Sequence, residues 1–248
     1  MNRRLLIAFD FDNTIADDNT DCVIRKLLPD EKYTESVKSM YLSTGWTAYM
    51  GKICELLHEN GITAKQIIDA VENIPAAPGM DELLNQLYSS DCETIVISDA
   101  NSLSINHWLR CKKLDHTIAR VFTNPARFDG EGVLKIEMYH KQDWCKLSSV
   151  NLCKGYILED YIQRRKDEGV EFEKIAYVGD GRNDFCPVLK LSENDLAFPR
   201  NDFPLQKILN NPSADKSKSV SAKIVSWSDG MDIWKELNET IIDLKNRK

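Results

Sequence analysis

The sequence predicts an α/β fold, a doubly wound and mostly parallel sheet with a helical cap inserted after its first strand. Three observations predict it: short apolar runs rich in β-branched residues, helical segments that alternate with these runs, and one long interval that contains helices only. The runs lie at residues 5–9, 94–97, 175–178 and 223–225. Several of them end directly in a carboxylate or a hydroxyl group, as strands do where a site forms at the carboxyl edge of a sheet.

The helical segments show the periodicity of helices that pack on one side. In residues 102–109 the apolar side chains form one stripe, and residues 155–164 repeat this pattern. Residues 17–74 break the alternation, because they contain no convincing strand, and Thr63 with Gln66 has the spacing of a capping box that opens one of the helices. We therefore expect a core formed by residues 1–16 and 75–240, a helical cap at 17–74 and a C-terminal tail at 241–248.

A second irregular segment, residues 121–139, interrupts the alternation within the core. Asp129, Gly130, Glu131 and Gly132 stand between two extended runs, and glycine-containing turns of this kind commonly join antiparallel strands. We therefore expect a β-hairpin in this segment.

Composition and charge exclude several classes of partner. The chain has 248 residues, 42% of them hydrophobic and 29% charged, which is typical of a folded globular protein. A formal net charge of -7 disfavours nucleic acid or an anionic membrane as the main partner. No apolar run is long enough to span a bilayer, and acidic residues interrupt the first apolar stretch before it could form a signal peptide. We therefore expect a cytoplasmic protein that acts on a small molecule.

The cysteines show neither a pairing pattern nor a metal-binding pattern. Their number is odd and no two of them have CxxC spacing, so we interpret them as reduced thiols, mostly small core residues. They are Cys22, Cys54, Cys92, Cys111, Cys145, Cys153 and Cys186. His140 lies near Cys145, but these two residues alone supply too few ligands to predict a zinc site.

The residues that carry chemistry follow three of the predicted strands. Asp10 and Asp12 come directly after the first strand, and the alternation of an extended chain points both carboxylates to one face. Ser98 follows the second strand ahead of a helix, and the sequence Gly-Asp-Gly-Arg-Asn-Asp at 179–184 follows the third. Lys154 opens a helical segment between them. Each piece alone is commonly a helix cap, a tight turn or a surface lysine, so the prediction depends on their combination.

The ordered set of Asp-x-Asp-x-Thr, serine, lysine and Gly-Asp-Gly-x-Asn-Asp resembles the haloacid-dehalogenase superfamily of phosphotransferases. The flanking residues resemble more closely the family of phosphoethanolamine/phosphocholine and pyridoxal-phosphate phosphatases. The matching stretches are 9–15 with Asp17, Asn19 and Asp21, then 97–101, 122–125, 151–154 and 179–187. Members of that family generally carry additional cysteines and a proline shortly before the lysine, and residues 145–154 depart from this pattern. The resemblance therefore does not support a metal-binding or structural role for a cysteine cluster there, while the lysine itself stays aligned.

The resemblance implies a phosphatase with a Rossmann-like haloacid-dehalogenase core. Asp10, ionised at neutral pH, would attack the phosphorus and form an aspartyl-phosphate. Asp12 would protonate the leaving oxygen and then act as a base toward the hydrolytic water. Ser98 would hold the transferring oxygens, and Lys154 would supply positive charge to Asp10 and to the phosphoryl group.

The same resemblance implies Mg²⁺ as cofactor. The ion would be held by Asp10, by the backbone carbonyl of Asp12 and by Asp180, while Asp184 would support the metal from outside its ligand shell. A cation is needed because a carboxylate and a phosphate charge repel each other by about 4 kcal/mol at ~4 Å and an effective dielectric of ~20.

Asp21 and Asp99 are acids beyond this minimal set. In the resembling family, residues at these positions bind the amine-bearing group of the substrate, which favours phosphoethanolamine or phosphocholine, although both acids could equally be helix caps. Residues 45–50 could present aromatic rings to the pocket, but such residues more often form the core of a cap. Similarity over the whole sequence favours pyridoxal 5′-phosphate.

Other functions stay open at this point. A phosphoserine phosphatase or a phosphomutase would keep the same reactive residues and differ in its cap contacts. A non-catalytic module that binds Mg²⁺ or a phosphate group is a second class, although such a module would not need an acid beside its nucleophile. The sequence contains neither a P-loop nor a His-Glu-x-x-His zinc motif. It does not predict an oligomeric state.

Overall fold

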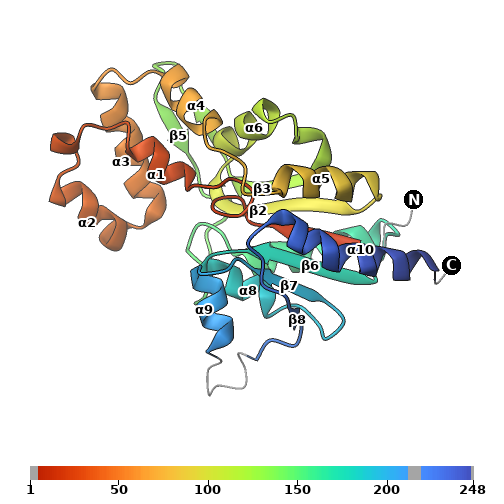
Figure 1. Cartoon of the computed structure of the whole chain (residues 1–248). Coiled ribbons are helices and arrows are strands. Elements are labelled where there is room, and N and C mark those ends of the chain that lie inside the picture. Colours follow the sequence, from red (N-terminus) through yellow and green to blue (C-terminus); the bar gives the residue numbers. More distant parts are fainter. Residues whose placement is uncertain (1–4, 212–218, 247–248) are drawn as a thin grey trace.

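The computed structural model describes residues 5–211 and 219–246, and its centre is a six-stranded sheet in which every pairing is parallel (Figure 1). The strand order across the sheet is β3-β2-β1-β6-β7-β8. The strands are β1 (Leu5–Phe9), β2 (Glu93–Asn101), β3 (Arg120–Asn124), β6 (Lys174–Gly179), β7 (Leu196–Pro199) and β8 (Lys223–Ile224). The predicted fold class is confirmed.

Strand β1 lies in the middle of the sheet because all five of its residues are apolar and buried. Phe9 pairs with Val96 of β2 on one side and with Val178 of β6 on the other. The chain therefore leaves β1 to build one half of the sheet and returns beside β1 to build the other half. The residues that follow β1 lie where the strand order reverses, which is the usual position of a ligand site in such sheets.

Helices cover both faces of the sheet. Leu5, Ile7 and Phe9 pack in one apolar cluster, whereas Leu6 and Ala8 pack in a second cluster on the opposite face. The helices on the first face are α5 (Met80–Ser89), α6 (Ser102–Cys111) and α10 (Gly230–Asn246), and those on the second are α7 (Lys154–Asp167), α8 (Phe185–Val188) and α9 (Pro204–Asn210). Burial on both faces explains why the strands are continuous hydrophobic runs. In residues 5–211 and 219–246, no helix is both long and apolar enough to cross a membrane.

A helical cap follows β1, as the sequence predicts. It consists of α1 (Thr20–Arg25), a 3-10 turn at Asp30–Lys32, α2 (Glu35–Thr44), α3 (Trp46–Glu59) and α4 (Ala64–Glu72). The capping box that opens α4 is present, because the Thr63 hydroxyl accepts a hydrogen bond from the Gln66 N–H and the Gln66 side chain accepts one from the Thr63 N–H. Figure 1 shows the cap on the side of the molecule away from both chain ends.

The boundaries between core, cap and tail stay predictions. Residues 1–4 and 212–218 of the predicted core and 247–248 of the predicted tail lie outside the described residues. Helix α10 continues to Asn246 and therefore crosses the predicted start of the tail.

The β-hairpin is shorter than the sequence predicts. Strand β4 (Ala126–Phe128) pairs antiparallel with β5 (Leu134–Ile136), and in the turn between them the Asp129 carboxylate accepts hydrogen bonds from the N–H groups of Glu131 and Val133 at 3.0 and 2.9 Å. Residues 121–124 belong instead to β3 of the main sheet, and Pro125, which has no N–H to donate, separates them from the hairpin. Strand β5 contacts α3 of the cap (Figure 1).

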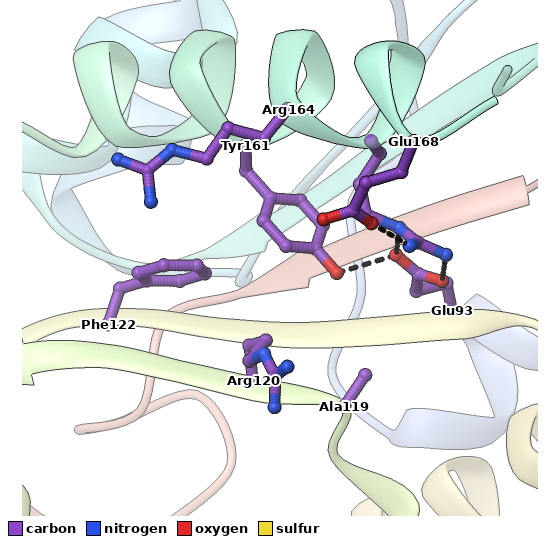
Figure 2. A pocket seen from close by; sticks show the side chains of 8 residues that line it. Glu93, Ala119, Arg120, Phe122, Tyr161, Arg164 and Glu168 are labelled. Carbon is purple, nitrogen blue, oxygen red and sulfur yellow. Dashed lines mark hydrogen bonds and ion pairs between the residues drawn. The ribbon is translucent and has the colours of Figure 1, made fainter. Parts of the chain in front are cut away.

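The amino-terminal end of the sheet is braced by Glu93, the first residue of β2. Arg165 of α7 donates hydrogen bonds to both of its carboxylate oxygens at 2.8 and 2.9 Å, and the Tyr161 hydroxyl donates at 2.5 Å. Glu93, Tyr161 and Arg165 line a cavity of about 590 Å³. Figure 2 shows Glu93 and Tyr161 in its wall, with Arg120 and Phe122 of β3. This contact fixes the C-terminal half of α7, so that the first residue of the helix is held at the opposite end of the sheet.

Candidate active site

The side chain of Lys154 joins two of the predicted site carboxylates. Its Nζ lies 2.7 Å from Oδ2 of Asp10 and 2.7 Å from Oδ1 of Asp184, and the side chain is 1% exposed. Lys154 is the first residue of α7, and Asp10 directly follows β1. Burial disfavours the lysine cation, but the two carboxylates outweigh burial, so the pKa of Lys154 is raised above its usual value. The ammonium group is therefore charged at the carboxyl edge of the sheet.

Asp184 accepts hydrogen bonds at both of its carboxylate oxygens. Besides the lysine, Oδ1 accepts from the hydroxyl of Tyr177 at 2.7 Å, and Oδ2 accepts from the N–H groups of Asp180 and Gly181 at 3.0 and 2.8 Å. Gly179 permits this close approach, since a Cβ atom there would lie 2.5 Å from the Asp184 carboxyl carbon. With its oxygens occupied by four donors, Asp184 is better placed to orient its neighbours than to bind a metal itself.

Three buried carboxylates meet around the lysine ammonium. Asp10, Asp180 and Asp184 each have an oxygen within 4.8 Å of the other two. Burial and the Asp184 charge raise the pKa of Asp10, and the same two causes raise the pKa of Asp180 to about 7. Within the described part of the chain, the Asp180 side chain receives one hydrogen bond, from Thr14 at 3.4 Å. One lysine does not balance three acids, and the less occupied carboxylate oxygens suit a hard divalent cation such as Mg²⁺.

Asp12 is held by the first helical residue of the cap. Its two oxygens accept hydrogen bonds from the N–H and the hydroxyl of Thr20, both at 3.1 Å, and Thr20 begins α1. Burial raises the pKa of Asp12 and the nearby Asp21 raises it further, whereas the hydrogen bonds from Thr20 lower it. The net upward shift favours the protonated acid, which is the form that can protonate a leaving oxygen.

Ser98 and Asp99 lie at the end of β2, beside the end of β1. Ser98 is fully buried, and its hydroxyl accepts a hydrogen bond from the Ala100 N–H at 3.3 Å. Asp99 accepts a hydrogen bond from the Asn183 side chain at 3.0 Å. Asn124 of β3 donates to the carbonyl oxygens of Asp99 and Ala100 at 2.7 and 2.9 Å. The end of β2 is therefore fixed from two sides, although among the described residues Ser98 makes no hydrogen bond to another predicted site residue.

A cavity of about 490 Å³ opens between the cap and the end of the sheet. Asp12, Asp21 and Asp99 line it, so three of the predicted residues face one space. The Trp46 indole donates a hydrogen bond to Oδ2 of Asp21 at 2.6 Å, while Oδ1 of Asp21 is buried and has no hydrogen-bond partner in the described residues. Burial raises the pKa of Asp21 to about 7. The cavity thus contains an acid whose hydrogen-bonding capacity is only partly used.

The aromatic stretch at residues 45–50 has both of the roles that the sequence left open. Trp46 and Tyr49 pack against the apolar core cluster, and Met50 is fully buried within that cluster. All three side chains also line the cavity, together with Tyr33. Aromatic surface therefore faces the acidic side chains across this space.

Arg200 was not among the residues predicted from the sequence, yet it braces the loop after β1. Its guanidinium group donates hydrogen bonds to the carbonyl oxygen of Asn13 at 2.6 Å and to Oδ1 of Asp17 at 2.5 Å. Asn13 has a φ of 55°, which is the left-handed conformation of a tight turn. Arg200 follows directly after β7. Because no pattern in the sequence predicts that strand, none could have placed this arginine near the site.

Comparisons with known proteins show which family the chain belongs to. The model of the family described as "Putative Phosphatase" matches residues 5–241. The pyridoxal phosphate phosphatase of Bos taurus is 38% identical over 93% of this chain and 95% of its own length. The phosphoethanolamine/phosphocholine phosphatase of Homo sapiens is 33% identical over 96% of this chain and 90% of its own length.

The fold is also shared with solved structures. A phospho-aspartyl intermediate analogue of phosphoserine phosphatase has a TM-score of 0.62 at 20% identity, covering 94% of this chain and 99% of that chain. This likeness concerns the fold alone. Since the family model and the relatives extend over nearly the whole length, the chain belongs to the "Putative Phosphatase" family.

Proposed function

We propose that this chain is a magnesium-dependent phosphatase that hydrolyses a small phosphomonoester through an aspartyl-phosphate on Asp10. The observation that carries the proposal is the position of Lys154, whose ammonium group bridges Asp10 and Asp184 at 2.7 Å with Asp180 close by. A single buried ion pair needs one acid for each base, because every additional buried charge costs free energy. Three acids around one lysine therefore favour a site that receives a cation, and that cation together with the Lys154 ammonium group can bind a phosphate group.

Four side chains perform the chemistry that we propose. Asp10 forms a bond to phosphorus while the bond between phosphorus and the leaving oxygen breaks, and Asp12 gives its proton to that oxygen. Asp12 then takes a proton from water, the water oxygen bonds to phosphorus, and the Asp10 carboxylate is released. Lys154 lowers the pKa of Asp10, which burial and the neighbouring acids raise, and so favours its ionised form; it also neutralises charge on the phosphoryl group. Ser98 donates a hydrogen bond to a transferring oxygen.

The cofactor that we propose for this site is Mg²⁺. The residues that would hold it are Asp10 and Asp180 through their carboxylates and Asp12 through its backbone carbonyl, and Asp184 would orient the lysine and the backbone of the loop after β6. When bound, Mg²⁺ would neutralise negative charge on the phosphate and on the acids.

The substrate that we propose is pyridoxal 5′-phosphate, with phosphoethanolamine and phosphocholine as the second candidates. The relative named as a pyridoxal phosphate phosphatase has the higher identity of the two classes, 38% against 33%. Trp46 and Tyr49 offer aromatic surface on which a pyridine ring can stack. Asp21 and Asp99 offer negative charge to an amine or a quaternary ammonium group, which supports the second candidates. A cavity of about 490 Å³ has the size of a small-molecule site.

We further propose that the protein acts in the cytoplasm, on a small molecule rather than on nucleic acid or a membrane. Cys22, Cys54, Cys111, Cys145, Cys153 and Cys186 form no disulfide in the structure, which is the state expected in a reducing compartment. The net charge of -7 supports a partner other than an anionic polymer or an anionic lipid surface.

Phosphate release from a panel of substrates tests the proposal. The panel contains pyridoxal 5′-phosphate, phosphoethanolamine, phosphocholine, phosphoserine and pyrophosphate, each with Mg²⁺ and with a chelator. We expect release to require Mg²⁺ and kcat/KM to be highest for pyridoxal 5′-phosphate. Asp10→Asn should abolish turnover, whereas Asp243→Asn, an exposed change in α10, should not. Equal rates on all substrates would contradict a selective acid-lined pocket, and full turnover by Asp10→Asn would contradict the mechanism.

A further inference from the structure

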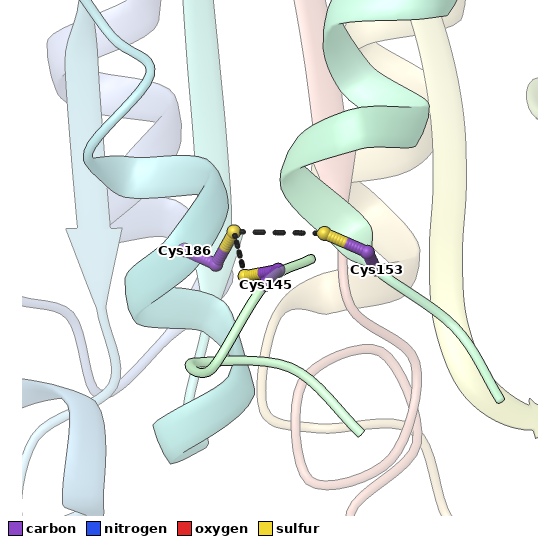
Figure 3. A group of neighbouring side chains, drawn as sticks. All are labelled: Cys145, Cys153 and Cys186. Carbon is purple, nitrogen blue, oxygen red and sulfur yellow. Dashed lines mark hydrogen bonds between the residues drawn. The ribbon is translucent and has the colours of Figure 1, made fainter. Parts of the chain in front are cut away.

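Three cysteine side chains from three different segments point toward one another (Figure 3). Cys145 lies in the loop before α7, Cys153 immediately precedes α7, and Cys186 belongs to α8. The Sγ atom of Cys186 is 3.5 Å from that of Cys145 and 3.8 Å from that of Cys153. All three thiols are free, and two of the three residues are buried.

The spacing of the sulfur atoms matches the edges of a tetrahedral metal site. With zinc–sulfur bonds of about 2.3 Å, two thiolates on one tetrahedral zinc lie about 3.8 Å apart. The three sulfur atoms lie within 4.8 Å of one another, so small side-chain shifts would bring all of them onto one ion. A disulfide would require two sulfurs to approach to about 2.05 Å and would leave the third unused.

The loop that contains Cys145 needs an anchor, because it lacks regular secondary structure. Residues 137–153 contain no helix and no strand of either sheet, and a segment this long without secondary structure is uncommon in a compact domain. The loop is organised around a polar side chain: Gln142 donates to the carbonyl oxygens of Cys145, Ser148 and Ser149 at 3.2, 3.2 and 2.7 Å. A metal ion would tie this loop to α7 and α8.

The side chains around the three sulfur atoms indicate which atom could be the fourth ligand of a tetrahedral metal ion. The Ser148 hydroxyl lies 3.4 Å from the Cys145 sulfur and 3.3 Å from the Cys153 sulfur. His140 is engaged elsewhere, because its Nε2 accepts a hydrogen bond from the Cys153 N–H at 2.9 Å. An oxygen atom, from Ser148 or from water, would therefore be the fourth ligand of an ion bound here, rather than the histidine.

We infer that Cys145, Cys153 and Cys186 form a zinc site with three thiolate ligands and one oxygen ligand. Thiolates select zinc over the hard Mg²⁺, whereas the carboxylate cluster prefers magnesium, so the protein would hold two chemically different metals. Cys153 precedes Lys154, and Cys186 lies two residues after Asp184. The ion would thus fix the relative position of the two helices whose neighbouring residues bring Lys154 and Asp184 together.

X-ray absorption at the zinc edge, on the full chain purified from zinc-supplemented cells with Mg²⁺ in every buffer, tests this inference. We expect one zinc per chain, with three sulfur neighbours at about 2.3 Å and one lighter neighbour. Replacement by Co²⁺ should give the strong near-ultraviolet absorption of cobalt bound to thiolates. Zinc bound by oxygen and nitrogen neighbours alone, or much less than one zinc per chain, would overturn the inference.

Two variants serve as a matched pair. Cys186→Ser should lose the cobalt–thiolate band and most of the zinc, whereas Cys111→Ser, which changes an exposed cysteine at the end of α6, should keep both. If Cys186→Ser fails to fold, the number of sulfur neighbours that X-ray absorption finds around zinc in the unaltered chain still tests the inference. A disulfide between any two of the three cysteines, found by peptide mapping of protein purified without reductant, would also overturn the inference.

Discussion

The ammonium group of Lys154 lies 2.7 Å from Oδ2 of Asp10, and both side chains are buried. The two residues come from different layers of the fold, since Asp10 extends from the central strand and Lys154 begins a helix on one face of the sheet. Their contact places the positive charge of the ammonium group beside the carboxylate that we propose as nucleophile. The predictions below follow from this pair and from the acids around it.

Replacement of Lys154 by methionine should lower both activity and stability. The substitution keeps an unbranched side chain, one heavy atom shorter than lysine, but leaves Asp10 and Asp184 buried without their cation. Breaking a buried pair in this way costs about 3–5 kcal/mol of the free energy of unfolding, and loss of a preorganised charge lowers kcat by about 10²–10³-fold. Urea unfolding and phosphate release would measure the two effects. Lys65→Met, which removes an exposed ion pair with Asp69, should change stability by less than about 1 kcal/mol.

Replacement of Asp12 by asparagine should reveal its role through the leaving group. The amide keeps the shape of the side chain but cannot give a proton to the leaving oxygen, so kcat for an alkyl phosphate should fall by about 10²–10⁴-fold. The loss should be much smaller for p-nitrophenyl phosphate, whose leaving group is stable without protonation. An equal loss for both substrates would argue against Asp12 as the proton donor.

Asp21 should make stability depend on pH. Burial raises its pKa in the folded protein from 3.8 to about 7, so the folded state holds the proton more tightly than the unfolded state. Stability should therefore fall as the pH rises from about 4 to about 7, with the full cost above that range. Asp21→Asn removes this cost and should be more stable than the unaltered chain at pH ~8, by on the order of 1–4 kcal/mol, and equally stable at pH ~4. Thermal unfolding at several pH values, with Asp243→Asn as the control, would measure the difference, and a gain that does not change with pH would contradict the prediction.

Asn124 should be more important for stability than an ordinary polar residue. It is fully buried and donates to two carbonyl oxygens at the end of β2, while its own carbonyl accepts hydrogen bonds from the Tyr139 N–H at 3.0 Å and the Asn151 side chain at 3.2 Å. Asn124→Ala leaves these groups without partners and should cost about 2 kcal/mol or more. Asn85→Ala, on an exposed helix surface, should stay within about 0.5 kcal/mol in the same denaturant titration. A similar small change at both positions would show that the network around Asn124 does not stabilise the fold.

Much of the fold could be predicted from local patterns. The strands β1, β2 and β6 are buried on both faces, so their sequences are apolar runs, and the first polar residue after each run marks the edge where the site lies. Strand β7 escaped prediction because it has only four residues, Leu-Ala-Phe-Pro, and ends in proline. The first extended run of the predicted hairpin is in fact β3, which pairs with β2 of the main sheet. Local sequence could not show this pairing, because β2 lies about 20 residues earlier in the chain.

The parts of the site that depend on tertiary contacts were harder to predict from the sequence. Asp10 and Asp180 could be predicted because each follows a recognisable strand. Arg200 and Asn124 could not, because their importance comes from partners far away in the sequence, such as Asp17. The three clustered cysteines are likewise separated by irregular spacing, and only folding brings their sulfur atoms together.

The identity of the phosphorylated residue tests the account most directly. Purified protein would be mixed with pyridoxal 5′-phosphate and Mg²⁺, quenched in acid during turnover, reduced with borohydride to convert an acyl phosphate to a stable product, and mapped by mass spectrometry. We predict modification at Asp10, and none in Asp10→Asn. A phosphoryl group on Ser98 or on another residue, or continued turnover by Asp10→Asn, would contradict the central claim that the carboxylate beside Lys154 attacks phosphorus.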